Sequence, residues 1–161
     1  MKAAMNILVL CTGNSARSIL LETILTHLSD GRIKGFSAGS KPAGKVHPQS
    51  RQLLRDLHFP TDGLRSKSWD EFGGDAAPVM DAVITVCGSA AGETCPYWAG
   101  APIRVHWGVD DPAAAAEADW EAAFQTAYDT LLARAKALFA LPFEDMDRET
   151  LTKELTRIGT L

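Results

Sequence analysis

The sequence has few cysteines, no excess of positive charge and no long apolar run, and each absence excludes a class of protein. Three cysteines in 161 residues are an odd and low number, which does not fit the disulfide framework of a small secreted domain. The formal net charge of −4 argues against a general nucleic-acid-binding protein, which would present a basic face. No stretch approaches the roughly 18 apolar residues of a transmembrane helix, so we expect no membrane association.

The bulk composition fits one domain that spans residues 1–161. Apolar residues make up 46% of the chain and charged residues 22%, both ordinary values for a globular protein. A chain of this length buries roughly two thirds of its unfolded surface and needs no metal or disulfide to fold. The N-terminus faintly resembles a lipoprotein signal, but Asn6 interrupts the apolar run and bulky Leu10 stands where a small residue would precede cleavage. We therefore expect a cytoplasmic protein with reduced thiols.

Short apolar runs of strand length alternate with helical patterns along the chain. We expect strands at residues 6–10, 33–39, 82–87 and 103–107. We expect helices at residues 16–28, 48–57, 119–141 and 147–158, the last with Asp147 as its N-cap. This alternation predicts an α/β fold of three layers, in which a four-stranded parallel sheet carries helices on both faces.

Three segments with unusual residues follow strands of this predicted sheet. Cys11 ends the first strand, Cys87 ends the third, and GVDDP (residues 108–112) follows the fourth. In parallel sheets the carboxyl ends of the strands meet at one edge, and ligands bind outside that edge. We therefore expect these three segments to form one site.

The segment CTGNSARS, residues 11–18, has the composition of an anion-binding loop between a strand and a helix. Small residues let the backbone curl around a phosphate-like oxyanion, which its N–H groups and the helix dipole favour. Arg17 adds a planar, two-pronged donor, and the same positive field favours the thiolate of Cys11, to which Ser18 donates a hydrogen bond. A buried structural cysteine in a tight turn is the alternative, which the strand–helix context disfavours. The residues expected to bind the oxyanion are Thr12, Gly13, Asn14, Ser15, Ala16, Arg17 and Ser18.

The spacing C-x5-R-S at the end of the first strand resembles the low-molecular-weight protein tyrosine phosphatase superfamily. Together with VITVCGSAAGETCP (residues 83–96) and HWGVDDPA (residues 106–113), it is similar to the arsenate reductases built on that fold, over residues 5–140. The resemblance implies a low-molecular-weight phosphatase-like domain that reduces arsenate to arsenite in arsenic detoxification, with no bound organic cofactor. Phosphate and sulfate are then expected to bind as analogues of arsenate.

The resemblance gives each cysteine a role. Cys11 attacks arsenic, and Cys87 then attacks the Cys11 sulfur and releases arsenite. Cys95 attacks Cys87 and leaves a Cys87–Cys95 disulfide for an external reductant. We expect thioredoxin as that reductant, with glutaredoxin or another low-molecular-weight thiol as the alternative.

The distance between Cys87 and Cys95 makes a geometric demand. The two are eight positions apart, which in a regular helix would separate them by about 12 Å. A disulfide requires Cα atoms within roughly 7 Å, so the segment must bend or unwind, as Gly88 and Gly92 permit. Structural zinc is a weaker alternative, because zinc prefers closer cysteine spacing and His106 is the only further candidate ligand. A buried core role for Cys87 is another alternative.

The resemblance places the general acid on Asp111, the aspartate that precedes Pro112, and Asp110 is the weaker candidate. Asp111 would protonate the departing oxygen as Cys11 attacks, so we expect partial burial that favours its protonated form. The alternative is a loop aspartate that caps a turn.

Some relatives bind potassium near the loop, with residues that match Asn14, Glu22 and Ser37 here. The remaining ligands would fall near residues 65–67, which are basic in this chain, so we expect no metal. Lys67 would replace the ion and pair with Glu22, and the alternative is a solvated surface lysine. The resemblance also makes Asn14 a brace that holds the loop through side-chain hydrogen bonds.

Two other functions stay open at this point. A phosphatase for phosphotyrosine or small phosphomonoesters needs only Cys11, Arg17 and Asp111, whereas a non-enzymatic thiol redox sensor needs neither the arginine nor the acid. We expect a monomer. The sequence leaves open which reductant acts, whether Cys95 is the final thiol, and what residues 147–158 do. The three histidines outside any motif are expected to be surface or structurally satisfied residues: His27, His47 and His58.

Overall fold

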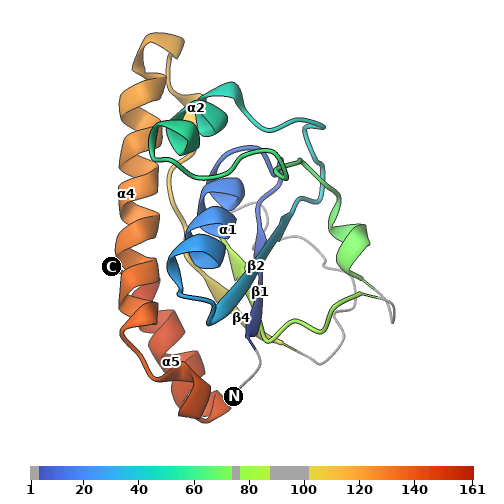
Figure 1. Ribbon diagram of the computed structural model, residues 1–161, viewed down its shortest axis with the longest axis vertical. Helices are drawn as coiled ribbons and strands as arrows, with labels where there is room; N and C mark the ends of the chain where they lie inside the picture. Colours follow the sequence, from blue (N-terminus) through green and yellow to red (C-terminus); the bar gives the residue numbers. More distant parts are fainter. Residues whose placement is uncertain (1–3, 74–76, 88–101) are drawn as a thin grey trace.

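Four parallel strands form one sheet in the order β2–β1–β3–β4 (Figure 1). The computed structural model describes residues 4–73, 77–87 and 102–161. The strands are β1 (Met5–Leu10), β2 (Ile33–Ala38), β3 (Ala82–Thr85) and β4 (Ile103–His106). The helices are α1 (Arg17–Leu28), α2 (Pro48–Asp56), α4 (Trp120–Phe139) and α5 (Arg148–Ile158), with 3₁₀ turns η1 (Trp69–Phe72), η2 (Pro112–Ala114), η3 (Glu117–Asp119) and η4 (Phe143–Asp145). Strand order and direction confirm the predicted parallel α/β sheet.

β1 lies in the interior of the sheet and pairs with both β2 and β3. Its last four residues are fully buried, which explains why its apolar run is continuous rather than alternating. The register places Leu10 beside Ala38 on one side and Thr85 on the other, and Thr85 beside His106 of β4. All four strands therefore end at the same edge of the sheet.

β2 shows how the two faces of the sheet are covered. Gly35 faces α1, because a Cβ atom there would lie 2.8 Å from the Glu22 carbonyl oxygen. Phe36, the next residue, faces the opposite side and packs edge-on against Phe72 of η1, with ring centroids 5.6 Å apart. The long helix α4, at the left of Figure 1, packs against α1 and α2.

α5 follows the predicted boundaries closely. Its N-cap is Asp147, whose carboxylate accepts the Thr150 N–H at 2.7 Å. Its buried face consists of Leu151, Leu155 and Ile158, and the helix packs against β4 and α4. The C-terminal helix predicted at residues 147–158 is therefore confirmed.

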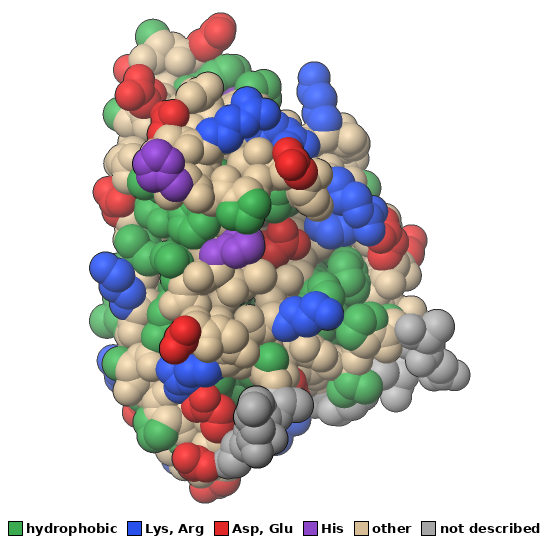
Figure 2. All heavy atoms as spheres, viewed as in Figure 1, with side chains coloured by type: hydrophobic (Ala, Val, Ile, Leu, Met, Phe, Trp, Pro, Cys, Tyr) green, Lys and Arg blue, Asp and Glu red, His purple; other side chains and the backbone are tan. Residues whose placement is uncertain are grey.

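The surface mixes charges of both signs. On the face shown in Figure 2, acidic and basic side chains are interspersed over the helices, in line with a net charge of −4. Among the helices in the described part of the chain, none is long and apolar enough to cross a membrane.

Candidate active site

The segments that follow β1, β3 and β4 meet at the carboxyl edge of the sheet. We call residues 11–18 the oxyanion loop and residues 108–115 the acid loop. Thr12 of the oxyanion loop donates its N–H to the Cys87 sulfur at 3.3 Å, just beyond β3. Arg17 of the same loop contacts the acid loop beyond β4. The predicted convergence of the three segments is therefore confirmed.

Carbonyl groups of the oxyanion loop point outward to donors from other segments. The main-chain N–H groups of Lys41, Ala43 and His47 donate to the carbonyls of Thr12, Gly13 and Ser15, respectively, at 2.9–3.0 Å. The hydroxyls of Ser50 and Ser66 donate to the carbonyls of Ser15 and Gly13, respectively, at 2.9 and 3.0 Å. In a trans peptide the carbonyl of one residue and the N–H of the next point in opposite directions. The N–H groups of Gly13, Asn14 and Ala16 therefore turn inward. The Gly13 N–H reaches the Cys11 sulfur. Such a concave set of N–H groups is an anion-binding arrangement.

Asn14 holds the oxyanion loop from within. It is fully buried and adopts the left-handed backbone conformation, with φ of 46°. Its Nδ2 donates to Ser18 Oγ at 2.8 Å, and its Oδ1 accepts the Lys67 N–H at 2.9 Å. The side-chain hydrogen bonds expected of Asn14 as a brace are present. Asn14 also adopts a left-handed backbone conformation, which was the alternative reason for an asparagine at this position.

Lys67 and Glu22 form a buried ion pair behind Asn14. Lys67 Nζ lies 3.6 Å from Glu22 Oε1 and donates to Ser37 Oγ at 3.2 Å, and the two charged side chains are 9% and 16% exposed. Burial raises the pKa of Glu22 against the attraction of Lys67, and burial lowers the pKa of Lys67 against the attraction of Glu22. The predicted pair is confirmed, and Lys67 is not a solvated surface lysine.

The Lys67 ammonium also lies among the three residues that the resemblance matched to a potassium site, Asn14, Ser37 and Glu22. Asn14 Oδ1 lies 3.4 Å from Nζ, and Ser37 and Glu22 contact the same nitrogen. Three oxygens that could hold a cation are thus already used by a cation of the chain itself. These residues do not fit a bound potassium ion.

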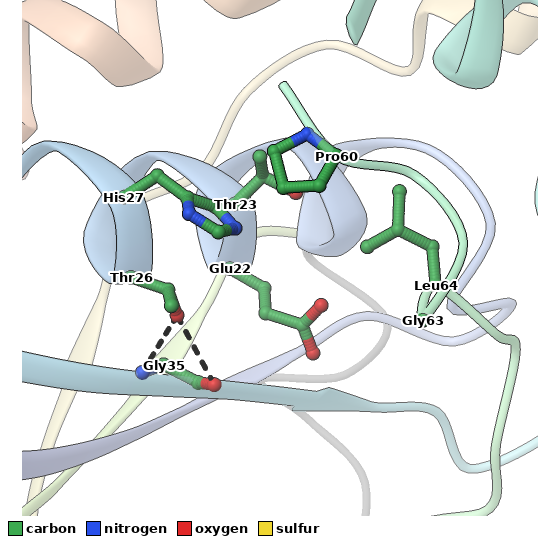
Figure 3. Close-up of a pocket in the computed structure, with 8 residues that line it drawn as sticks. All are labelled: Glu22, Thr23, Thr26, His27, Gly35, Pro60, Gly63 and Leu64. Carbon is green, nitrogen blue, oxygen red and sulfur yellow. Dashed lines mark hydrogen bonds between the residues drawn. The ribbon is translucent and has the colours of Figure 1, made fainter.

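Glu22 also lines a cavity of about 370 Å³ (Figure 3). Glu22 and Thr26 reach it from α1, and the Thr26 hydroxyl bonds to the backbone of Gly35 on β2. Its lining residues are Glu22, Thr23, Thr26, His27, Gly35, Pro60, Gly63 and Leu64. None of them belongs to the oxyanion loop or the acid loop, so this cavity is not where the oxyanion would bind.

Cys11 and Cys87 are both buried, and their side chains hydrogen-bond to each other. This hydrogen bond raises the pKa of Cys11, and burial raises it further, whereas the charge of Arg17 and the Gly13 N–H lower it. The net direction is upward. Arg17 and the loop N–H act in the expected direction, toward the thiolate, and the second sulfur, which the expectation omitted, acts against it.

Asp111 caps a turn and faces Arg17. Its Oδ1 accepts the Ala113 N–H at 3.0 Å as the N-cap of η2, and its Oδ2 lies 3.7 Å from Arg17 Nη2. The turn-capping alternative is thus confirmed, and the second oxygen stays beside the site. The side chain is 44% exposed, so it is partly covered and still open to solvent.

Arg17 ties the two loops together. Its Nη1 donates to Val109 O at 2.8 Å, and its side chain is 13% exposed. Its Nε is buried and, among the described residues, has no hydrogen-bond partner. A buried donor of this kind suits a tetrahedral oxyanion in the oxyanion loop.

A family model of the low molecular weight phosphotyrosine protein phosphatases matches residues 6–156. The chain belongs to this family. An arsenate reductase of Halalkalibacterium halodurans is 33% identical over 129 residues, which cover 79% of this chain and 89% of the relative. A solved arsenate reductase in the phosphate binding state has a TM-score of 0.69 at 26% identity and covers 84% of this chain and 97% of its own. The thioredoxin-dependent arsenate reductase of Corynebacterium glutamicum shares the fold, with a TM-score of 0.62 at 20% identity over 86% of this chain and 61% of that one.

In this member of the phosphatase family, four of the five predicted catalytic residues lie together: Cys11, Arg17, Cys87 and Asp111. Cys95 and the bend expected after Cys87 lie outside the described residues. Sequence reasoning missed the segments that hold the oxyanion loop, residues 41–50 and Ser66. One signal was available, since Pro48 at the first position of a helix marks His47 as its N-cap.

The acid loop of this phosphatase-family chain is held from behind. Arg134 of α4 donates Nη1–H to Gly108 O at 3.0 Å, at the start of the loop. Trp107, directly before it, is fully buried and donates its indole N–H to Leu155 O of α5 at 2.9 Å. α5, whose role the sequence left open, therefore supports the junction between β4 and the acid loop.

Proposed function

We propose that this chain reduces arsenate to arsenite, with Cys11 as the nucleophile. The observation that carries the proposal is the second thiol, because Cys87 hydrogen-bonds to Cys11 within the same site. A phosphatase needs one nucleophilic cysteine, an arginine and an acid. Reduction of As(V) to As(III) needs two electrons as well, which a pair of thiols supplies. The arsenate reductases among the relatives support the same assignment.

The first step forms a bond between sulfur and arsenic. Arsenate binds to the inward N–H groups of the oxyanion loop and to Arg17, whose buried Nε gives a further donor. The Cys11 sulfur attacks arsenic, and one As–O bond breaks. The thiol proton and the arsenate hydroxyl leave together as water, with Asp111 delivering the proton to the departing oxygen. Arsenic is still As(V) in this adduct.

The second step transfers the electrons. The Cys87 sulfur attacks the Cys11 sulfur, a disulfide bond forms, and the S–As bond breaks with its electron pair passing to arsenic, while the Cys87 thiol proton passes to an oxygen of the departing arsenite. Arsenic leaves as arsenite, As(III). Cys95 then attacks Cys87 and releases Cys11, and an external dithiol reduces the Cys87–Cys95 disulfide. We assign this last step to a thioredoxin, with glutaredoxin as the alternative, and expect the protein to act as a cytoplasmic monomer.

Arsenate-dependent NADPH oxidation tests the proposal, with thioredoxin and thioredoxin reductase in one arm and glutathione and glutaredoxin in the other. The wild-type chain should turn over in the thioredoxin arm. Cys87→Ser should abolish turnover with either reductant and keep hydrolysis of p-nitrophenyl phosphate. Cys11→Ser should lose both activities and serves as the matched control. Turnover by Cys87→Ser at the wild-type rate would show that the relay is wrong.

Phosphomonoester hydrolysis is the second candidate function. The contact of Arg17 with the acid loop favours it, because Cys11, Arg17 and Asp111 suffice to form and release a cysteinyl phosphate. Water would then attack the cysteinyl phosphate and free Cys11, a step that the attack of Cys87 replaces in the arsenate reaction. Hydrolysis of p-nitrophenyl phosphate without arsenate-dependent NADPH oxidation would make this the main activity.

A further inference from the structure

His47 contacts the structure around the site in three ways. Its main-chain N–H donates to Ser15 O of the oxyanion loop at 3.0 Å. Its ring Nδ1 accepts the Gln49 N–H at 3.0 Å and so caps the first turn of α2. Its ring also packs against two aromatic rings of α4, with centroid distances of 4.6 Å to Trp120 and 4.8 Å to Phe124. One side chain thus joins two helices next to a loop that would bind substrate.

The first turn of α2 supports the oxyanion loop at one peptide. Besides the His47 N–H, the Ser50 hydroxyl donates to the same Ser15 carbonyl at 2.9 Å. The Ser15 carbonyl and the Ala16 N–H belong to the same peptide group, so fixing the carbonyl outward directs the Ala16 N–H into the loop. If this turn of α2 frays, both donors move away from Ser15 and the inward N–H is no longer fixed.

Trp120 connects the other side of the His47 ring to the acid loop. Its indole N–H donates to Ala115 O, the last residue of the acid loop, at 2.9 Å. Phe124, which shares the contact with the His47 ring, is fully buried and anchors this part of α4 in the core. Asp111 acts on His47 from the acid loop through its charge. The ring therefore lies between the two loops that the proposed chemistry must align.

We propose that His47 is a positioning residue, whose imidazole keeps the oxyanion loop and the acid loop in register by capping α2 and by packing against Trp120. The inference rests on the proposed function, in which arsenic bound by one loop must meet the proton donor of the other. The two roles belong to different parts of the ring. The cap needs the lone pair of Nδ1, and the contact with α4 needs the aromatic face and edge.

The cap requires a neutral imidazole, because a protonated Nδ1 cannot accept the Gln49 N–H. Burial lowers the pKa of His47, Asp111 raises it and Lys45 lowers it. The charges that act on the ring are those of Asp111 in the acid loop and Lys45 in the segment before α2, while α4 packs against it with Trp120 and Phe124, which carry no charge. The direction of this pKa agrees with a ring that accepts a hydrogen bond.

Two substitutions separate the roles. His47→Asn keeps a side-chain acceptor for the cap and removes the ring, so the acid loop should be misplaced: kcat should fall about fivefold while KM for arsenate stays within twofold. His47→Phe keeps the ring and removes the acceptor, so the oxyanion loop should loosen: KM should rise about fivefold while kcat stays within twofold. Trp120→Phe, which loses the indole N–H to Ala115 and reduces the aromatic surface against His47, should follow the kcat pattern of His47→Asn.

Controls distinguish this inference from the proposed function. His27→Asn removes an exposed histidine that packs against Phe59 and touches neither loop, so it should leave both constants unchanged. If the wild-type chain does not reduce arsenate, two other readouts replace the arsenate constants. His47→Asn should lower kcat for p-nitrophenyl phosphate, and His47→Phe should weaken the protection of Cys11 from iodoacetamide by inorganic phosphate. Then the proposed function fails and the inference stands. Equal losses in both constants for both variants, or no loss in either, would overturn the role of His47.

Discussion

Two sulfur atoms lie at the carboxyl edge of the sheet, and the chemistry of the site depends on how they share protons. Cys87 accepts the Thr12 N–H at 3.3 Å and hydrogen-bonds to Cys11. The hydrogen bond with Cys87 contributes most to raising the pKa of Cys11, ahead of burial, while Arg17 lowers it. The same thiol that would later receive the oxidation therefore acts against deprotonation of the nucleophile.

At this residue scale, Cys87→Ala should lower the pKa of Cys11. The substitution removes the cause that raises this pKa most and leaves Arg17 and the Gly13 N–H, which lower it. At a fixed pH near 7, more of Cys11 is then thiolate, so alkylation by iodoacetamide should be faster and its midpoint should lie at lower pH. Cys11→Ala gives the background rate of the other cysteines. An unchanged or higher midpoint would show that burial, and not Cys87, controls Cys11.

At the scale of elements, the strands and helices could be predicted from the sequence, whereas the groups that hold the oxyanion loop could not. The apolar run of β1, the stop of α4 before Pro142 and the Asp147 cap are local patterns in the sequence. The oxyanion loop, in contrast, is held mainly by main-chain N–H groups from residues 41–47, and main-chain donors leave no signature in the sequence. The ion pair behind Asn14 could be predicted only because family resemblance pointed to a cation there.

Lys67→Met should destabilise the α1–β2 layer and do so more strongly at neutral pH than at pH 5. Glu22 would stay buried without its partner, which costs about 3 kcal/mol at neutral pH. Burial already raises the pKa of Glu22, and loss of Lys67 raises it further. The folded state then binds a proton that the unfolded state has lost, so the free energy of unfolding falls as pH rises above about 4.3.

Urea unfolding at pH 5 and pH 7 measures this effect. The double variant Lys67→Met with Glu22→Gln removes the buried charge, so it should regain most of the lost stability and lose the additional pH dependence. The matched control is Lys153→Met, because Lys153 is exposed and its pair with Glu149 lies on the surface of α5. Equal loss at both pH values in Lys67→Met would mean that the lysine acts through packing alone.

At the scale of the whole molecule, the acid loop depends on parts of the chain that carry no catalytic group. α5 packs against β4 and accepts the Trp107 indole N–H at Leu155 O, and Arg134 of α4 donates to Gly108 O. Gly159 lies so close to β4 that a Cβ atom would be 2.6 Å from His106 O. The start of the acid loop, which carries Asp111, is thus held by α4 and α5.

Leu155→Ala should lower the melting temperature of the whole domain rather than detach α5 alone. Leu155 is fully buried in the common core, and truncation of such a leucine costs about 2–5 kcal/mol. For a domain of this size, 1 kcal/mol corresponds to about 2–4 °C, so we expect a single transition lowered by about 5–15 °C. Calorimetry measures it, with Lys153→Ala on the exposed face of the same helix as the control. Two separate transitions, or full arsenate turnover after α5 has melted, would show that the helix is an independent appendage.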